Sequence, residues 1–258
     1  MVQTAQAEKI IEVKNLSSGY GGGLTFDDIS FDIKKGEVFV ILGGSGCGKS
    51  TMLKHLIGLY KPYSGQILIE GQDVVQAEGT QRLEILNRIG VMYQSGALFG
   101  SMTLLENIML PLEEFTDLPE AARRSVAALK LMLVGLQGFE SHMPSEISGG
   151  MQKRAAIARA MALDPKILFL DEPSAGLDPI TSAELDQLIL QLSGNLGITF
   201  VIVTHELDSI YSIADRIIML DKKTKKIIAE GDPKYLKEHA DNENVKKFFN
   251  RQVSKDEL

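Results

Sequence analysis

The sequence predicts an α/β fold built around a mainly parallel sheet. Three apolar runs, at residues 38–42, 167–170 and 198–203, have the length and composition of buried strands. A helical stretch at residues 180–196 separates the last two runs, and strands that alternate with helices are typical of parallel sheets. A glycine-rich segment follows the first run and leads into a helical stretch. We therefore expect a strand–loop–helix unit within this core.

The composition is that of a globular protein with room for one large domain or two small ones. The chain has 258 residues, of which 44% are hydrophobic, and a net charge of −7. Its pI of about 5.2 argues against a general affinity for nucleic acid, which usually needs a basic face. A single cysteine, Cys47, excludes an internal disulfide framework. No window approaches the roughly 18 consecutive apolar residues of a membrane span.

The glycine-rich segment fits the phosphate-binding P-loop pattern G-x-x-x-x-G-K-[ST]. Its residues are Gly43, Gly44, Ser45, Gly46, Cys47, Gly48, Lys49, Ser50 and Thr51. Glycines let the backbone wrap around an anion, and the helix that follows adds the positive end of its dipole. Lys49 is expected to reach the β- and γ-phosphates, and the Ser50 hydroxyl to hold Mg²⁺. The alternative is a glycine-rich turn with a chance Lys-Ser pair, which the flanking strand and helix disfavour.

The N-terminal part reads as an antiparallel β subdomain. Residues 10–13 and 29–33 partly alternate between apolar and polar and flank a turn-rich segment at 19–23, and residues 66–69 predict a further short strand. From about residue 87 to 149 the pattern becomes mainly helical, which predicts an inserted helical subdomain. Within it, residues 104–110 and 119–134 are helical, with Asp117 as a cap.

The C-terminal part completes the core and adds a tail. The lysine-rich residues 222–226 predict an exposed hairpin turn, and residues 245–249 predict a short helix. No second P-loop-sized repeat is present. We therefore expect one nucleotide-binding domain over residues 8–239, followed by a tail over residues 240–258.

Acidic and histidine side chains follow two of the buried strands. Asp171 and Glu172 end the run at 167–170, which matches the Walker B arrangement, where Asp helps to hold Mg²⁺. Glu172 is then placed to polarise an attacking water. An isolated Asp-Glu pair would usually be a solvated turn. His205 follows the run at 198–203 and can hydrogen-bond a γ-phosphate, although a lone histidine is more often structural.

A second glycine-containing motif precedes the helical run at residues 152–163. Ser148 is a good N-cap, and Gly149 and Gly150 expose backbone N–H groups. The motif is either a plain helix start or a second anion site at a helix N-terminus.

Together these motifs resemble the nucleotide-binding domain of ATP-binding-cassette (ABC) transporters. The matched motifs are the aromatic-loop Tyr20, the P-loop at 43–51, Gln94 of the Q-loop, the signature Ser148, Gly149 and Gly150, Walker B Asp171 with Glu172, the D-loop at 174–178 and the switch His205. The resemblance implies a P-loop NTPase (RecA-like) core that hydrolyses ATP with Mg²⁺.

The same resemblance assigns roles to several residues. Two copies would form a head-to-tail homodimer, with each ATP between the P-loop of one copy and the signature Ser148–Gly150 of the other, in trans. Tyr20 would stack on adenine, or be an exposed loop residue. Gln94 would contact Mg²⁺ or water. The signature departs from Leu-Ser-Gly-Gly-Gln at Ile147 and Met151, which puts one polar contact in doubt.

Two segments narrow the resemblance to one branch. Residues 94–99 and 142–156 resemble the ATPase of bacterial Mla-type phospholipid transport systems. This implies an MlaE-type permease, an MCE-domain lipid-binding protein and, in some members, a STAS-domain protein, with the ATPase peripheral on the cytoplasmic face of the inner membrane. Residues 97–99 would dock the permease, or, for Leu98, pack in the core. The alternatives are an importer of an amino acid or metal, and a soluble ABC ATPase.

Cys47 lies inside the phosphate loop, among N–H dipoles that can lower the pKa of a thiol. We therefore predict that a thiol alkylator inhibits ATP hydrolysis and that MgATP protects against it. A buried, unreactive thiol is the alternative.

Overall fold

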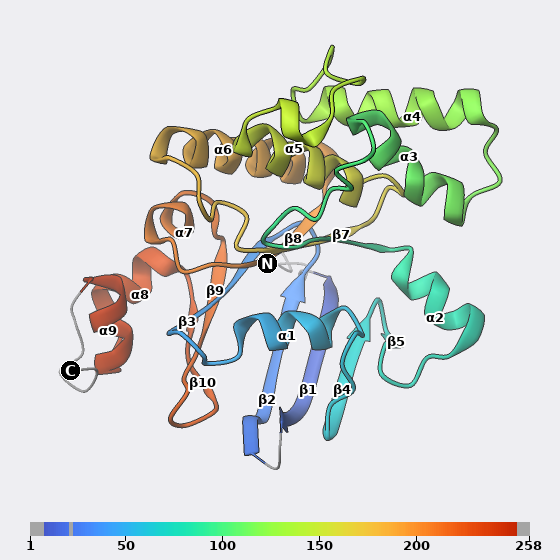
Figure 1. Ribbon diagram of the computed structural model, residues 1–258. Helices are drawn as coiled ribbons and strands as arrows, with labels where there is room; N and C mark the ends of the chain where they lie inside the picture. Colours follow the sequence, from blue (N-terminus) through green and yellow to red (C-terminus); the bar gives the residue numbers. More distant parts are fainter. Residues whose placement is uncertain (1–7, 21–22, 252–258) are drawn as a thin grey trace, which may run out of the picture.

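The computed structural model describes residues 8–20 and 23–251, and its strands form two sheets (Figure 1). The four-stranded sheet is antiparallel and has the order β2 (Gly23–Lys34), β1 (Lys9–Tyr20), β4 (Ser64–Ile69), β5 (Gln72–Asp73). The six-stranded sheet has the order β10 (Ile227–Gly231), β9 (Arg216–Leu220), β3 (Val38–Gly43), β8 (Thr199–Val203), β7 (Ile167–Asp171), β6 (Ile89–Met92). All its neighbouring pairs are parallel except β9 and β10. The predicted α/β class and antiparallel N-terminal subdomain are confirmed.

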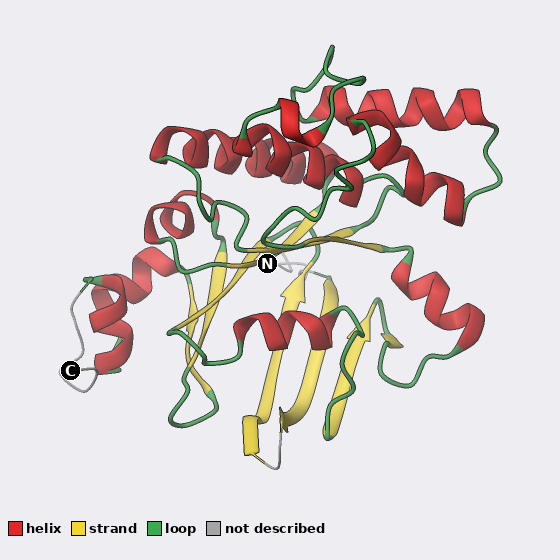
Figure 2. Cartoon of the chain, in the orientation of Figure 1, coloured by secondary structure: helices red, strands yellow, loops and turns green. Residues whose placement is uncertain are grey.

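Nine helices lie around the two sheets in the described part of the chain, and Figure 2 distinguishes helices in red from strands in yellow. Their bounds are α1 (Lys49–Leu56), α2 (Gly79–Leu86), α3 (Leu104–Phe115), α4 (Glu120–Leu133), α5 (Gly149–Ala160), α6 (Pro179–Leu196), α7 (Leu207–Ile213), α8 (Pro233–His239) and α9 (Glu243–Phe249). A short 3₁₀ turn spans Pro144–Glu146. No helix in the described part of the chain is both long enough and apolar enough to span a membrane.

The six-stranded sheet has a separate apolar core on each face. On β3, Val38, Val40 and Leu42 point into a core shared with α3, α4, α5, α6 and α7. Phe39 and Ile41 point to the opposite face, where α1 and the antiparallel sheet complete a second core. This alternation is the two-residue period of a strand. Because both faces of β3 are covered, its position is fixed from both sides, and with it the start of the loop that follows.

The helices α3 and α4 pack against each other and against α5 (Figure 1). The strand β6, Ile89–Met92, lies inside the range predicted to be mainly helical, yet it pairs in parallel with β7. Its four residues are too few to show a period, and its partner lies far along the chain. Helical structure in this insertion therefore begins only at α3.

Two details of the helix boundaries differ from the prediction. The cap predicted at Asp117 is wrong, because α4 begins after an extended Pro119. A capping side chain must reach the second or third helical N–H, and Asp117 lies two residues too far upstream. The helix α3 also continues beyond residue 110 through Pro111, since Leu112 in its last turn is buried in the core.

The C-terminal segment folds against the main core. The predicted turn at 222–226 joins β9 to β10 as an exposed hairpin. The predicted helix at 245–249 corresponds to α9, whose Val245 and Phe249 are buried. Residues 240–251 thus contribute apolar side chains to the same core as α7 and the sheet.

Candidate nucleotide-binding site

The glycine-rich loop runs from the end of β3 to the start of α1. Gly46 and Gly48 have φ values of 72° and 102°, which only glycine adopts without strain. A Cβ on Gly48 would lie 2.7 Å from the ring of Phe26, so β2 backs the loop closely. The Lys49 Nζ donates to the carbonyl oxygens of Gly43 at 2.9 Å and Gly44 at 3.4 Å. The loop therefore has the closed P-loop shape, with its ammonium group held inside the curve.

Cys47 differs from the prediction made for it. The side chain is only 3% exposed and packs in the core beneath the loop. Burial raises the pKa of the thiol, and the nearby Lys49 charge opposes that shift without cancelling it. The expected lowering of its pKa is wrong, because burial in the apolar core outweighs the Lys49 charge and the backbone N–H groups of Cys47 and Lys49, which favour the thiolate. The alternative of a buried, unreactive thiol fits this geometry.

The residues predicted to hold Mg²⁺ lie together at the carboxyl ends of the strands. The Ser50 hydroxyl donates to the Asp171 carboxylate at 3.2 Å. A cavity of about 720 Å³ is lined by both residues and by Gln94. Burial raises the pKa of Asp171, and the Glu172 charge adds to this shift. Mg²⁺ prefers hard oxygen ligands and often takes only one or two from the protein, so this donor set fits the ion.

Glu172 and His205 face each other across the ends of β7 and β8. The His205 Nδ1 lies 2.8 Å from Glu172 Oε1, while Glu172 Oε2 is buried without a hydrogen-bond partner among the described residues. Glu172 has a φ of 48°, and its N–H donates to the Val203 carbonyl at 2.8 Å. A left-handed backbone is strained for a glutamate, and here it lies directly after β7 at the edge of the site. In this structure His205 contacts the glutamate directly.

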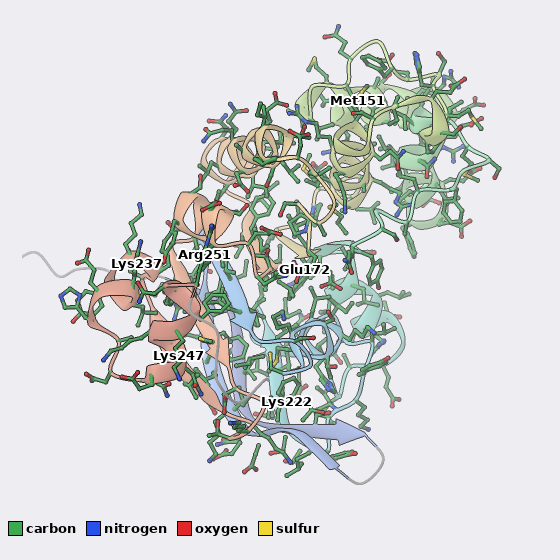
Figure 3. All side chains as sticks on the ribbon, turned by 60° about the vertical axis from the view of Figure 1, so that its left-hand side comes forward. Met151, Glu172, Lys222, Lys237, Lys247 and Arg251 are labelled. Atoms are coloured by element: carbon green, nitrogen blue, oxygen red, sulfur yellow. The ribbon has the colours of Figure 1, made fainter. Side chains whose placement is uncertain are left out.

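The signature residues lie at the start of α5, away from this cavity. Ser148 is the N-cap, and its hydroxyl accepts from the Met151 N–H at 3.3 Å. Gly150 has no room for a side chain, since a Cβ would lie 2.3 Å from Thr181 Cγ2. Figure 3 labels Met151 near the top of the view and Glu172 at its centre, well apart. Within one chain the signature therefore does not reach the cavity that Ser50, Gln94 and Asp171 line.

The family of the chain follows from comparison with known sequences. The sequence profile of the family described as "ABC transporter" matches residues 26–175. The chain belongs to this family. The predicted resemblance to an ABC transporter ATP-binding subunit is thereby confirmed. This ABC cassette belongs to a family of ATPases that bind ATP.

Individual relatives support the same assignment. The cassette is 40% identical to the intermembrane phospholipid transport system ATP-binding protein MlaF of Haemophilus influenzae, over 91% of this chain and 88% of that protein. It is 39% identical to MlaF of Escherichia coli K12, over 90% and 86%. It is also 46% identical to a probable ribonucleotide transport ATP-binding protein of Mycobacterium leprae, over 83% of this chain. The cassette spans only 61% of the length of that mycobacterial relative.

Solved structures of ABC proteins have the same fold. One is cbiO1 of Clostridium perfringens, described as part of an ABC transporter complex. It matches with a TM-score of 0.82 and 31% identity, over 95% of this chain and 96% of that chain. Another is a dimeric ATP-binding cassette in a post-hydrolysis state with ADP and Pi. It matches with a TM-score of 0.77 and 33% identity, over 86% of this chain and 98% of that chain.

Two cations on α5 of the cassette hold the Q-loop, and the sequence analysis missed them. Lys153 is 8% exposed, and its Nζ donates to the Gln94 carbonyl. Arg159 donates to the carbonyls of Ala97 at 2.8 Å and Gly96 at 3.0 Å. Burial lowers the pKa of Lys153, and the negative charge of Glu172 opposes that shift. A lysine within a buried, alanine-rich helix was the available signal.

Two further expectations concern single side chains. The Tyr20 side chain lies outside the described residues, so its predicted stacking on adenine stays a prediction. Leu98 is half-buried against the main core, whereas Phe99 is 49% exposed and lies beneath the Arg159 guanidinium, 5.8 Å from its ring centroid. The segment at 97–99 thus divides into one packing residue and one exposed aromatic ring.

Proposed function

We propose that this ABC cassette is the ATP-hydrolysing subunit of a transporter that moves phospholipid between the inner and outer membranes. The observation that carries the substrate class is the 39–40% identity to proteins named MlaF, extending over 86–88% of their length. The mycobacterial relatives carry another substrate in their name, but the cassette covers only 59–61% of their length. The near full-length match favours phospholipid.

The proposed chemistry assigns a step to each group of the site. The loop at 43–51 binds the triphosphate, and Ser50, Asp171 and Gln94 hold Mg²⁺, whose charge offsets that of the β- and γ-phosphates. Glu172 accepts a proton as water attacks the γ-phosphorus and the bond to the bridging oxygen breaks. His205 orients Glu172 through its 2.8 Å contact and donates to the γ-phosphate when nucleotide is present.

The proposed active unit is a homodimer. Each chain supplies a P-loop and a signature, which lie apart in one copy, so the second copy would bring Ser148, Gly149 and Gly150 to the γ-phosphate in trans. The free N–H groups at the start of α5 suit an anion. Ser148→Arg should abolish cooperative ATP hydrolysis while leaving ATP binding unchanged by calorimetry. Lost binding together with unfolding in that variant would contradict the assignment.

The proposed permease contact is an exposed apolar area around the Q-loop. Tyr93 and Phe99 flank Gln94 along the chain and are 38% and 49% exposed. Exposed large apolar side chains grouped in this way are typical of protein interfaces. We assign this area to an MlaE-type permease, which an MCE-domain protein and a STAS-domain protein would accompany. The cassette would then be peripheral on the cytoplasmic face of the inner membrane.

Co-purification from native membranes tests this proposal. A tagged Glu172→Gln chain, loaded with MgATP to hold the dimer closed, is expected to recover a polytopic membrane protein and phospholipid. A Lys49→Ala chain, which lacks the phosphate contact, serves as the matched control. Phospholipid should stimulate ATP hydrolysis by the recovered wild-type complex, and ribonucleotides, amino acids and metal ions should not. Recovery of ribosomes without any membrane protein would overturn the transporter assignment.

A further inference from the structure

A second lysine lies at the rim of the phosphate loop. Lys222 is in the exposed turn between β9 and β10. Figure 3 labels this residue below Glu172. Its Nζ lies 3.7 Å from the position that a Cβ on Gly46 would occupy. Apart from the residues adjoining Gly46, no other heavy atom of residues 8–20 and 23–251 comes within 4 Å of that position. The ammonium group therefore lies directly beside the exposed part of the loop.

The fold fixes the turn that carries Lys222. Gly43, the first residue of the loop, pairs with Leu220 in the sheet, so Lys222 follows only two residues later. The Asp221 carboxylate accepts from the N–H of Thr224 at 2.8 Å and from its hydroxyl at 2.9 Å. The Lys225 carbonyl accepts from the Asp27 N–H at 3.0 Å, which ties the turn to β2. The position of Lys222 is thus set by the strands that support the loop.

The Lys222 ammonium has no ion-pair partner within the described part of the protein. The carboxylate of Asp221, next to it in the chain, keeps its charge but is turned to the N–H and hydroxyl of Thr224. No hydrogen bond or ion pair joins the Lys222 ammonium to another described residue, whereas Lys49 is held by two carbonyl oxygens. A cation beside the exposed residues Gly44, Ser45 and Gly46, with no carboxylate in ion-pair contact, favours an anionic ligand at this rim.

We infer that Lys222 is a nucleotide-binding residue that contacts the α- or β-phosphate. Backbone N–H groups in the middle of a P-loop cradle the α- and β-phosphates, while the lysine of the motif, here Lys49, reaches the β- and γ-phosphates. Gly46 belongs to that middle part, so its neighbour Lys222 meets phosphates that ATP and ADP share. The inference rests on the loop at 43–51 holding the nucleotide.

Calorimetric titration of the full-length chain tests this assignment. Lys222→Met is compared with wild type, with Lys222→Arg and with Lys226→Met, which removes one charge from the same turn. ATP and ADP are titrated without Mg²⁺, so that no hydrolysis occurs. We expect Lys222→Met to weaken both nucleotides equally, by about three- to tenfold. Lys222→Arg should retain most of the affinity, Lys226→Met should match wild type, and the loss should shrink as salt rises.

Three outcomes would overturn the inference. Equal losses of affinity in Lys222→Met and Lys226→Met, relative to wild type, would show that only overall charge matters. A loss confined to ATP would place the ammonium at the γ-phosphate. Unchanged affinity in Lys222→Met, while a Lys49→Met chain loses binding, would reject the role of Lys222 and leave the ATPase site standing. Loss of nucleotide binding in wild type itself would instead contradict the proposed site.

Discussion

Asp186 is a buried carboxyl whose ionisation should make the stability of the cassette depend on pH. It lies on α6, is 6% exposed, and its side chain hydrogen-bonds to Ser209 on α7. Burial raises the pKa of Asp186 from 3.8 to about 6, and Ser209 only partly opposes the shift. Because the folded state holds the proton more tightly, this group favours folding more as the pH falls from 8 towards 4.

The size of the effect follows from the two pKa values. A carboxyl that titrates at 3.8 when unfolded and at about 6 when folded costs the folded state about 3 kcal/mol at pH 8 and about 2 kcal/mol at pH 5. Asp186→Asn keeps the shape and a partner for Ser209 but cannot ionise. Its advantage in unfolding free energy over wild type should therefore be about 1 kcal/mol larger at pH 8 than at pH 5.

Urea unfolding of both chains at pH 5, 6, 7 and 8, without nucleotide, measures this difference. The exposed Asp117→Asn serves as the control and should show the same pH profile as wild type. Other titrating groups, including the buried His55, whose pKa burial lowers, are common to all chains and cancel in the comparison. A difference between Asp186→Asn and wild type that stays constant from pH 5 to 8 would refute the burial argument.

Three further predictions concern the site. Glu172→Gln should keep ATP affinity but lower kcat by about 100-fold or more in steady-state phosphate release; unchanged turnover would remove Glu172 from the proton transfer. Lys153→Met should raise the Mg²⁺ concentration for half-maximal ATP hydrolysis by about threefold or more, since it frees the Gln94 backbone. Lys153→Arg should keep the wild-type Mg²⁺ requirement, and ATP binding without Mg²⁺ should not change in either variant. An unaltered Mg²⁺ requirement in Lys153→Met would contradict the positioning role. Cys47 should react with a maleimide only as fast as the chain opens, with or without MgATP; rapid labelling of the folded chain by mass spectrometry would contradict its burial.

Local sequence predicted the parts of the site that depend on short-range chemistry. The glycines, Lys49 and Ser50 form a loop that can be recognised because their spacing alone identifies the motif. Asp171 and His205 could be placed because they directly follow apolar strands, and parallel strands end at one edge of a sheet. The N-cap role of Ser148 needed only the residues next to it. These features required no knowledge of distant neighbours.

The features that were missed depend on contacts between distant segments. The strand β6 exists because β7 pairs with it, and its own four residues carry little signal. The raised pKa of Cys47 reflects a core formed by several strands, which a local argument about N–H dipoles cannot include. The cations Lys153 and Arg159 look like ordinary helix residues until the Q-loop carbonyls are brought beside them. Each of these features arises from tertiary packing.

The central place of β3 in its sheet has a consequence for synthesis of the chain. Its two neighbours, β8 and β9, are translated much later, and Gly43 pairs with Leu220 of β9. At typical translation rates the phosphate loop would leave the ribosome on the order of 10 to 30 seconds before its support. The nascent protein would hold a complete P-loop sequence without an ATP site throughout that interval. Acquisition of nucleotide binding is thus a late event in the life of the chain, although its motif is among the first parts to be made.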